Sequence, residues 1–311
     1  MRLTSLTESG LGISRTEITD LFEPFAPHRF DLDSPEWRDE LRRRKRKLLG
    51  KYLKRNSLRW SPSTHRNEAA IISEYSKAWN PDAYKHYRLG GIPPRLSPWI
   101  YDGQGMFASD IGGTRFRQLL LIRTIEQTRP KRVLEVGCGN GINLMLLACR
   151  FPEVEFAGLE LTHEGHAAAV GMQQQPELPA EMQEFAPLPL VDPSAFRRIQ
   201  FIQGSAAELP FEDNEFDLVC TILALEQMER IRDQALNEIA RVAGKHTLML
   251  EPFRDVNKGW ARINVIQRNY FRGAIDELPR YGLRPVMASD DFPQEVFLKA
   301  CAVLSEKQAS G

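Results

Sequence analysis

The sequence has few cysteines, and nothing in it has the pattern of a metal site or a membrane span. Its cysteines are Cys138, Cys149, Cys220 and Cys301; they form no Cys-x-x-Cys pair, and no Cys/His cluster has metal-ligand spacing. We therefore expect reduced thiols and no metal cofactor. The N-terminus lacks the apolar core of a signal peptide, and no run reaches the roughly eighteen apolar residues of a membrane span. These absences predict a cytoplasmic protein without a membrane partner.

The formal net charge at pH 7 is zero, but the charged residues are unevenly distributed along the chain. Residues 1–130 contain 23 Lys/Arg and 15 Asp/Glu, whereas residues 131–311 contain 18 and 26. The most basic run is RRRKRK, Arg42 to Lys47, inside a predicted helix over residues 34–57. Such a run forms a solvated helix face, a nuclear signal or a phosphate-binding surface. The basic part therefore suits an acidic or phosphorylated partner, or packing beside the acidic part.

The predicted elements divide the chain at residue 130. Residues 1–130 predict a basic, helical extension with a loosely ordered start and a Pro/Gly-rich loop, and its helices are expected over residues 34–57, 64–89 and 112–129. From residue 131 to 311, short β-branched runs alternate with helical patterns. This alternation predicts parallel βαβ units, and thus an α/β sheet covered on both faces.

Three departures from this alternation are expected in the second part. Residues 175–198 hold five prolines and predict an irregular insertion, and residues 254–280 predict a helical excursion. The last two strands, in YGLRPVMAS and QEVFLKACAVL, are expected to pair as a terminal antiparallel hairpin. In such sheets ligands bind beyond the carboxyl ends of the strands, so that edge is where a site is expected.

A glycine-rich turn follows the first strand of the predicted sheet, in VLEVGCGNG. Glycines at Gly137, Gly139 and Gly141 let the backbone turn tightly and approach a ligand closely. A dinucleotide fingerprint would require Gly or Ala at position 142, where this sequence has Ile142, so the spacing does not fit an NAD site. Glu135 precedes the glycines at the strand end, where a carboxylate can meet a cationic amino group. A glycine turn without a ligand is the alternative.

Two further segments complete a candidate nucleotide site. Glu160 ends the second strand, about twenty residues beyond the glycines, where a carboxylate can accept hydrogen bonds from ribose hydroxyls. Ser205 and Ala206 follow the third strand, where a hydroxyl and a backbone N–H can read an adenine edge. The alternative for Glu160 is a solvated charge in a loop, and the alternative for Ser205 and Ala206 is an ordinary polar loop.

Four stretches together resemble class I S-adenosylmethionine-dependent methyltransferases, most closely their small-molecule branch: VLEVGCGNG, the spaced GLE, GSAAELPFEDNEFDLV and LALEQM. The resemblance covers residues 131–253 and implies a Rossmann-like, seven-stranded, mostly parallel sheet with S-adenosyl-L-methionine as cofactor. It implies Glu135 near the methionine amino group and Glu160 on the ribose. Ser205 stands where the family often has Asp. The Asn/Asp-Pro-Pro-aromatic motif of base-methylating relatives is replaced by TILA.

Acceptor-side residues are predicted from their places in this framework. Thr221 lies at the end of the fourth strand and is assigned to the cofactor site. Glu226 follows it, as a general base, a substrate contact or a charge favoured by a helix start. The family often uses the segment before the first strand and the excursion after the fifth to form the acceptor pocket. That usage suggests four substrate-binding residues: Tyr87, Arg115, Trp260 and Tyr270.

Three functions remain open at this point. The first is methyl transfer to a small-molecule acceptor, at O or N rather than C. The second is methylation of RNA or protein recruited by the basic helix, although no RNA-binding module accompanies it. The third is a catalytically silent scaffold that binds the cofactor. The sequence leaves the oligomeric state open.

Overall fold

A seven-stranded sheet forms the centre of the molecule. The structure is a computed structural model that describes residues 2–57, 87, 89 and 96–308. The strand order is β6-β5-β4-β7-β8-β11-β9. The strands are β4 (Arg132–Val136), β5 (Glu155–Glu160), β6 (Gln200–Gln203), β7 (Phe216–Ile222), β8 (Ala243–Glu251), β9 (Leu283–Ser289) and β11 (Cys301–Lys307). The five neighbouring strands β6, β5, β4, β7 and β8 pair in parallel, and β11 pairs antiparallel with both β8 and β9. The predicted fold class and its antiparallel end are thereby confirmed.

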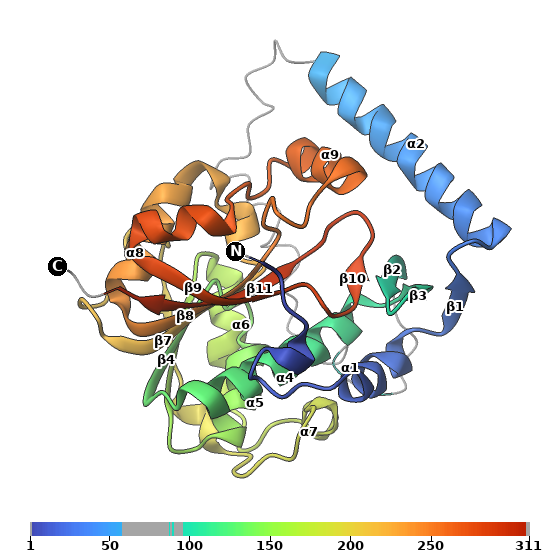
Figure 1. Cartoon of the computed structure of the whole chain (residues 1–311). Coiled ribbons are helices and arrows are strands. Elements are labelled where there is room, and N and C mark those ends of the chain that lie inside the picture. Colours follow the sequence, from blue (N-terminus) through green and yellow to red (C-terminus); the bar gives the residue numbers. More distant parts are fainter. Residues whose placement is uncertain (1, 58–86, 88, 90–95, 309–311) are drawn as a thin grey trace.

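Helices cover both faces of this sheet, because its central strands are apolar on both sides. In β4, Val133 belongs to one hydrophobic cluster, and its neighbour Leu134 belongs to the other. Helices α4 (Asp110–Thr128), α5 (Ile142–Arg150) and α6 (His163–Gln173) contribute to the first cluster. Helix α8 (Arg232–Val242) and the 3-10 helix η8 (Ile275–Tyr281) contribute to the second. Figure 1 shows the sheet between these layers.

The N-terminal extension forms a second sheet, which the sequence did not predict. Strands β1 (His28–Asp31), β2 (Ser97–Tyr101) and β3 (Gln104–Ala108) join β10 (Gln294–Glu295) in the antiparallel order β1-β3-β2-β10. Three of these strands lie before residue 130 and the fourth near the C-terminus, so the sheet crosses the predicted domain boundary. That boundary stays a prediction.

Several local predictions are corrected by the structure. The start of the chain is not loosely ordered, because α1 (Arg15–Phe22) begins with a capping box between Ser14 and Glu17. The Pro-rich insertion contains α7 (Ala180–Phe185), whose Met182 and Phe185 are fully buried. The predicted last strand begins only at Cys301, since the chain before it leaves the central sheet to form β10.

The remaining helical predictions agree with the structure where it describes them. Helix α2 (Pro35–Ser57) matches residues 34–57, α4 matches residues 112–129 closely, and α9 (Gly259–Arg268) lies in the predicted excursion. The helix expected over residues 64–89 falls almost wholly outside the described residues. None of the helices described here combines the length and the apolarity needed to cross a bilayer. Within the same residues, no group of three His, Cys, Asp or Glu side chains is placed to hold a metal ion.

Candidate functional site

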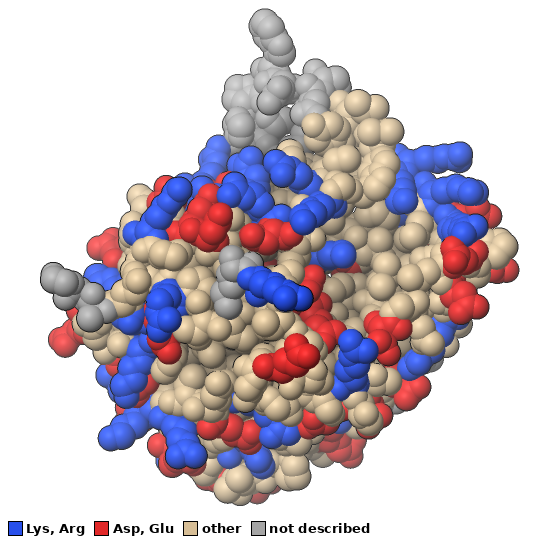
Figure 2. Space-filling view, viewed as in Figure 1, with Lys and Arg blue, Asp and Glu red and all other residues tan. Residues whose placement is uncertain are grey.

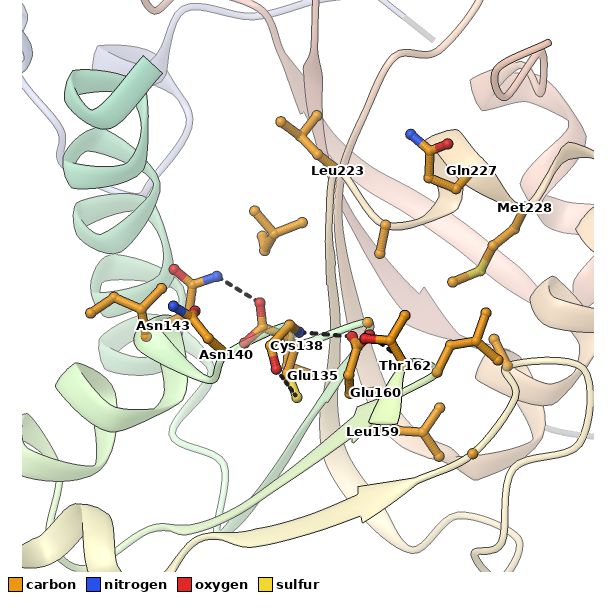
Figure 3. A pocket seen from close by; sticks show the side chains of 18 of the residues that line it. Glu135, Cys138, Asn140, Asn143, Leu159, Glu160, Thr162, Leu223, Gln227 and Met228 are labelled. Atoms are coloured by element: carbon orange, nitrogen blue, oxygen red, sulfur yellow. Dashed lines mark hydrogen bonds between the residues drawn. The ribbon is translucent and has the colours of Figure 1, made fainter. Parts of the chain in front are cut away.

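A cavity opens at the carboxyl ends of β4 to β7, where the strand order reverses between β4 and β7. Its lining comes from the turns after β4, β5, β6 and β7 and from one face of α4, and Figure 3 shows many of these side chains pointing toward a common space. Seven of the predicted site residues line it: Tyr87, Glu135, Gly137, Gly139, Glu160, Ser205 and Ala206.

The glycine turn fits tightly under this cavity. Gly137 has φ +79°, and a Cβ there would lie 2.5 Å from the Cβ of Ala224 in the turn after β7. Gly141 has φ +78° and is the N-cap residue of α5, and a Cβ there would lie 2.6 Å from the Phe201 ring. Only glycine adopts these backbone angles without strain and leaves this space free. Gly141 does not line the cavity.

Glu135 is a buried carboxylate with one oxygen satisfied and one unpartnered. Its Oε1 accepts a hydrogen bond from Asn143 Nδ2 at 2.6 Å, and Asn143 Oδ1 accepts one from Gln118 Nε2 at 2.7 Å. This chain of bonds ties β4 to α5 and α4. Glu135 Oε2 is buried and has no partner among the described residues. Burial raises the pKa of Glu135 to about 8. A cationic ligand in the cavity would therefore satisfy an oxygen that the protein leaves unpaired.

Glu160 is fixed by three hydrogen bonds at the end of β5. Its Oε1 accepts from the backbone N–H of Thr162 at 2.9 Å and from the Thr162 hydroxyl at 2.6 Å. Its Oε2 accepts from the backbone N–H of Gly139 at 3.0 Å. A carboxylate oxygen has room for further hydrogen bonds, so a pair of hydroxyls can still bind. Since Gly139 and Glu160 touch, one nucleoside can contact both.

The turn after β7 forms the opposite wall and is held by Glu251 at the end of β8. Glu251 Oε1 accepts from the backbone N–H groups of Ala224 and Leu225, and its Oε2 accepts from that of Glu226, at 3.0–3.1 Å. In the same turn Leu223 has φ +53°, and its side chain lines the cavity. The buried carboxylate thus fixes a turn that contains a strained non-glycine residue.

Glu226 lies beside the cavity rather than in its lining. Its Oε1 accepts from Gln227 Nε2 at 2.8 Å, and Gln227 lines the cavity. Its Oε2 is buried without a partner among the described residues. Burial raises the pKa of Glu226 to about 7, although the charges of Arg268 and Arg117 oppose this shift. A carboxyl with this pKa exchanges a proton near neutral pH.

The other predicted residues lie away from the cavity lining. Thr221 is fully buried within β7. Arg115 Nε donates to the carbonyl of Phe185 at 3.1 Å, and the Tyr270 hydroxyl accepts from Arg268 at 3.0 Å. Trp260 lines a separate hollow beside α9. Their assigned roles stay predictions.

Helix α4 supplies lining residues that the sequence analysis did not single out. Thr114 and Arg117 line the cavity, one turn apart on the same face as Asp110. Burial lowers the pKa of the Arg117 guanidinium, and the only hydrogen bond found for it within the described residues is to Thr114, at 3.5 Å. Tyr87 hydrogen-bonds the side chain of Asn140, and burial raises the pKa of its hydroxyl to about 12. The spacing of Asp110, Thr114 and Arg117 places them on one face of a helix but gives no sign that this face lines a cavity.

A mostly parallel sheet with a glycine turn after its first strand, an acid after its second, and a cavity over both defines a nucleotide-binding α/β protein. Residues 134–249 match the family model described as a methyltransferase domain. Residues 134–249 thus carry a methyltransferase domain, in agreement with the class I S-adenosylmethionine-dependent family and the cofactor that the sequence predicts.

Known relatives match only part of the chain. A fatty-acid O-methyltransferase of Mycolicibacterium smegmatis is 32% identical over 36% of this chain and 33% of its own length. Ajmaline N-methyltransferase of Rauvolfia serpentina is 23% identical over 57% of this chain and 55% of its own length. Demethylmenaquinone methyltransferase of Porphyromonas gingivalis is 29% identical over 45% of this chain and 51% of its own length. The chain therefore spans between a third and about half of the length of these curated relatives.

Solved structures share the fold at low sequence identity. The [4+2]-cyclase SpnF has a TM-score of 0.55 at 15% identity, covering 79% of this chain and 98% of that one. Magnesium protoporphyrin IX methyltransferase from Synechocystis, with bound S-adenosylhomocysteine, has a TM-score of 0.52 at 9% identity, covering 78% and 100%. These likenesses establish the architecture, and the chemistry of this chain has to be argued from its own site.

Proposed function

We propose that this protein transfers the methyl group of S-adenosylmethionine to a small-molecule acceptor, at oxygen or nitrogen. The observation that carries the proposal is the unpartnered Oε2 of Glu135, buried at the cavity and two positions before the glycine turn. An ammonium group is the ligand that this oxygen fits best, because a charge-assisted hydrogen bond offsets its burial. The curated relatives that methylate small molecules support the same acceptor class.

Each end of the donor has a matching group in the cavity. Glu135 Oε2 binds the amino group of the methionine part, and Glu160 binds the ribose hydroxyls. Ser205 and Ala206 lie in the lining where the adenine is expected. The glycines allow the backbone to approach the ligand without a side chain in the way. The bound donor supplies an electrophilic methyl group on a sulfonium, whose leaving group is neutral.

The acceptor occupies the part of the cavity between α4 and the turn after β7. Tyr87, Thr114, Arg117 and Gln227 line this part and can orient a polar acceptor. Alignment of the nucleophile with the methyl group supplies most of the catalysis, since an in-line displacement depends on geometry. For a hydroxyl acceptor, Glu226 takes up the proton through one bridging water, because its pKa is about 7 and it lies beside the cavity next to Gln227.

The remaining predicted roles belong to the same proposal. Thr221 and Gly141 support the cofactor site from beneath, and Arg115, Trp260 and Tyr270 act on the acceptor side from positions outside the lining. An acceptor with an acidic or phosphate group fits Arg117, for which no ion pair is found within the described residues. We also expect a cytoplasmic location.

Calorimetry with S-adenosylhomocysteine tests donor binding, and transfer of labelled methyl groups to pooled metabolites tests the reaction. We expect micromolar binding in the wild type and weaker binding in Glu135→Gln, with Glu181→Gln as an exposed control. Failure of the wild type to bind would refute the proposal. Binding without transfer to any metabolite pool would instead favour the catalytically silent scaffold.

A further inference from the structure

Helix α2 carries a basic surface that the proposed methyl transfer does not use. From residue 41 to 57 its sequence contains nine Lys/Arg and no Asp/Glu. The helix lies at the edge of the molecule, where it packs against α9 and β1 (Figure 1). Trp37 and Leu48 are buried on its inner side. Figure 2 shows Lys and Arg side chains projecting from this region of the surface.

Most cations in the middle of α2 are not neutralised by the protein. Ion pairs with Asp39 and Glu40 involve only the arginines that precede Lys45. Over the residues that the structure describes, no ion pair is found for four cations further along: Lys45, Arg46, Lys47 and Lys51. Arg46 is exposed on the outer side, whereas Lys45, Lys47 and Lys51 lie on the flanks, where they line hollows that also contain Asp or Glu side chains. An unpaired cluster of this kind attracts an anionic partner over about a Debye length, roughly 8–10 Å at physiological salt.

Two leucines lie among these cations and face outward. Leu49 is 40% exposed and Leu53 is 57% exposed. At helical spacing, Arg42, Arg46, Leu49 and Leu53 follow one another along a single stripe of the helix. Exposed leucines bury little apolar surface against the sugar-phosphate backbone of a nucleic acid. They bury much more apolar surface in the acyl region of a bilayer, from which neighbouring Lys and Arg side chains can reach the lipid phosphates.

We propose that α2 docks the protein on a bilayer of anionic phospholipid, with its axis along the membrane surface and Leu49 and Leu53 inserted below the headgroups. A helix of 23 residues is about 34 Å long, enough to contact several lipids. Anionic lipids attract each basic side chain, and the two leucines add apolar contact. The expectation of no membrane partner rested on the lack of a spanning segment, which a helix lying on the surface does not need.

Vesicle flotation of the full-length protein tests the proposal. The probes are vesicles of phosphatidylcholine alone and of phosphatidylcholine with about one third phosphatidylglycerol, at low and high salt. We expect binding only to the anionic vesicles, weakening with salt. Leu49→Gln with Leu53→Gln should reduce the partition coefficient at least about tenfold, because two apolar contacts are lost while every charge remains. Arg46→Glu should also weaken binding.

Matched variants separate docking from general effects. Val191→Gln changes another exposed apolar residue, and Arg280→Glu reverses another exposed charge, so neither should alter flotation. Circular dichroism and S-adenosylhomocysteine binding check that the folded domain is intact. No flotation of the wild type overturns the proposal. Flotation that is unchanged by the leucine substitutions, together with equally tight binding of single-stranded RNA, overturns the lipid assignment in favour of a nucleic-acid partner.

Discussion

The unpartnered oxygen of Glu135 predicts a specific pH dependence of donor binding. Burial raises the pKa of Glu135 to about 8 in the protein without ligand. Only the ionised carboxylate accepts the donor's ammonium group, so the proton has to leave before or during binding. Below pH 8 the ionised fraction falls about tenfold per pH unit, and the observed affinity should fall by the same factor. We therefore expect S-adenosylhomocysteine to bind about tenfold more tightly at pH 7 than at pH 6.

Glu135→Gln removes both the charge and its titration. A hydrogen bond to a charged group contributes about 1.5–3 kcal/mol, so the variant should bind the ligand about 10- to 150-fold more weakly at pH 8. Its affinity should be nearly flat between pH 6 and 8, where the wild type is steep. Calorimetry in two buffers of different ionisation enthalpy should show proton release on binding by the wild type and none by the variant.

The same carboxylate should oppose folding when no ligand is bound. Its pKa is raised in the folded state, so the folded protein holds a proton that the unfolded chain releases above its ordinary carboxyl pKa. The free energy of unfolding of Glu135→Gln minus that of the wild type should therefore increase by about 1.4 kcal/mol per pH unit between pH 5 and 8. Urea titrations across this range measure it. A constant difference, together with pH-independent donor affinity, would contradict the assignment of Glu135.

Three further predictions concern the turns around the cavity. Gly137→Ala should abolish donor binding, because the left-handed backbone at this position strains any side chain and the new Cβ would lie 2.5 Å from that of Ala224. Adding Ala224→Gly to this variant removes the second Cβ and should restore part of the affinity for S-adenosylhomocysteine, measured by calorimetry. Glu251→Gln should raise the acceptor KM and lower the free energy of unfolding by about 1–3 kcal/mol. The reason is that an amide cannot accept all three backbone hydrogen bonds as strongly as the glutamate side chain does. Unchanged kinetics would refute the positioning role of Glu251. Glu226→Gln should lower kcat about 10²-fold for a hydroxyl acceptor and remove the limb of the pH–rate profile near pH 7, whereas a helix-start role would leave that limb in place.

The sequence predicted that the glycine turn and Glu160 lie close together, because the signals for both are local. The glycine turn and Glu160 each follow directly from a strand, and parallel strands bring their carboxyl ends to one edge. The hydrogen bond between Gly139 and Glu160 is the outcome of that rule. Once the alternation of strands and helices was recognised, these two positions had to lie close together.

The side of the cavity formed by α4 was harder to predict because it depends on contacts between distant segments. Arg117 reaches the cavity only because α4 packs beside α5, and a helical arginine gives no local sign of that placement. Trp260 and Tyr270 lie in the expected excursion, but the orientation of α9 is set by its packing on α2. Strand β10 is two residues long and pairs with β2, from the other end of the chain. A pairing that short has no periodicity to detect.

The most direct test of the account is a crystal structure of the protein with S-adenosylhomocysteine. It should show the ligand's amino nitrogen within hydrogen-bonding distance of Glu135 Oε2, and both ribose hydroxyls beside Glu160. A ligand bound elsewhere, or bound in this cavity with its amino group turned away from Glu135, would contradict the central claim.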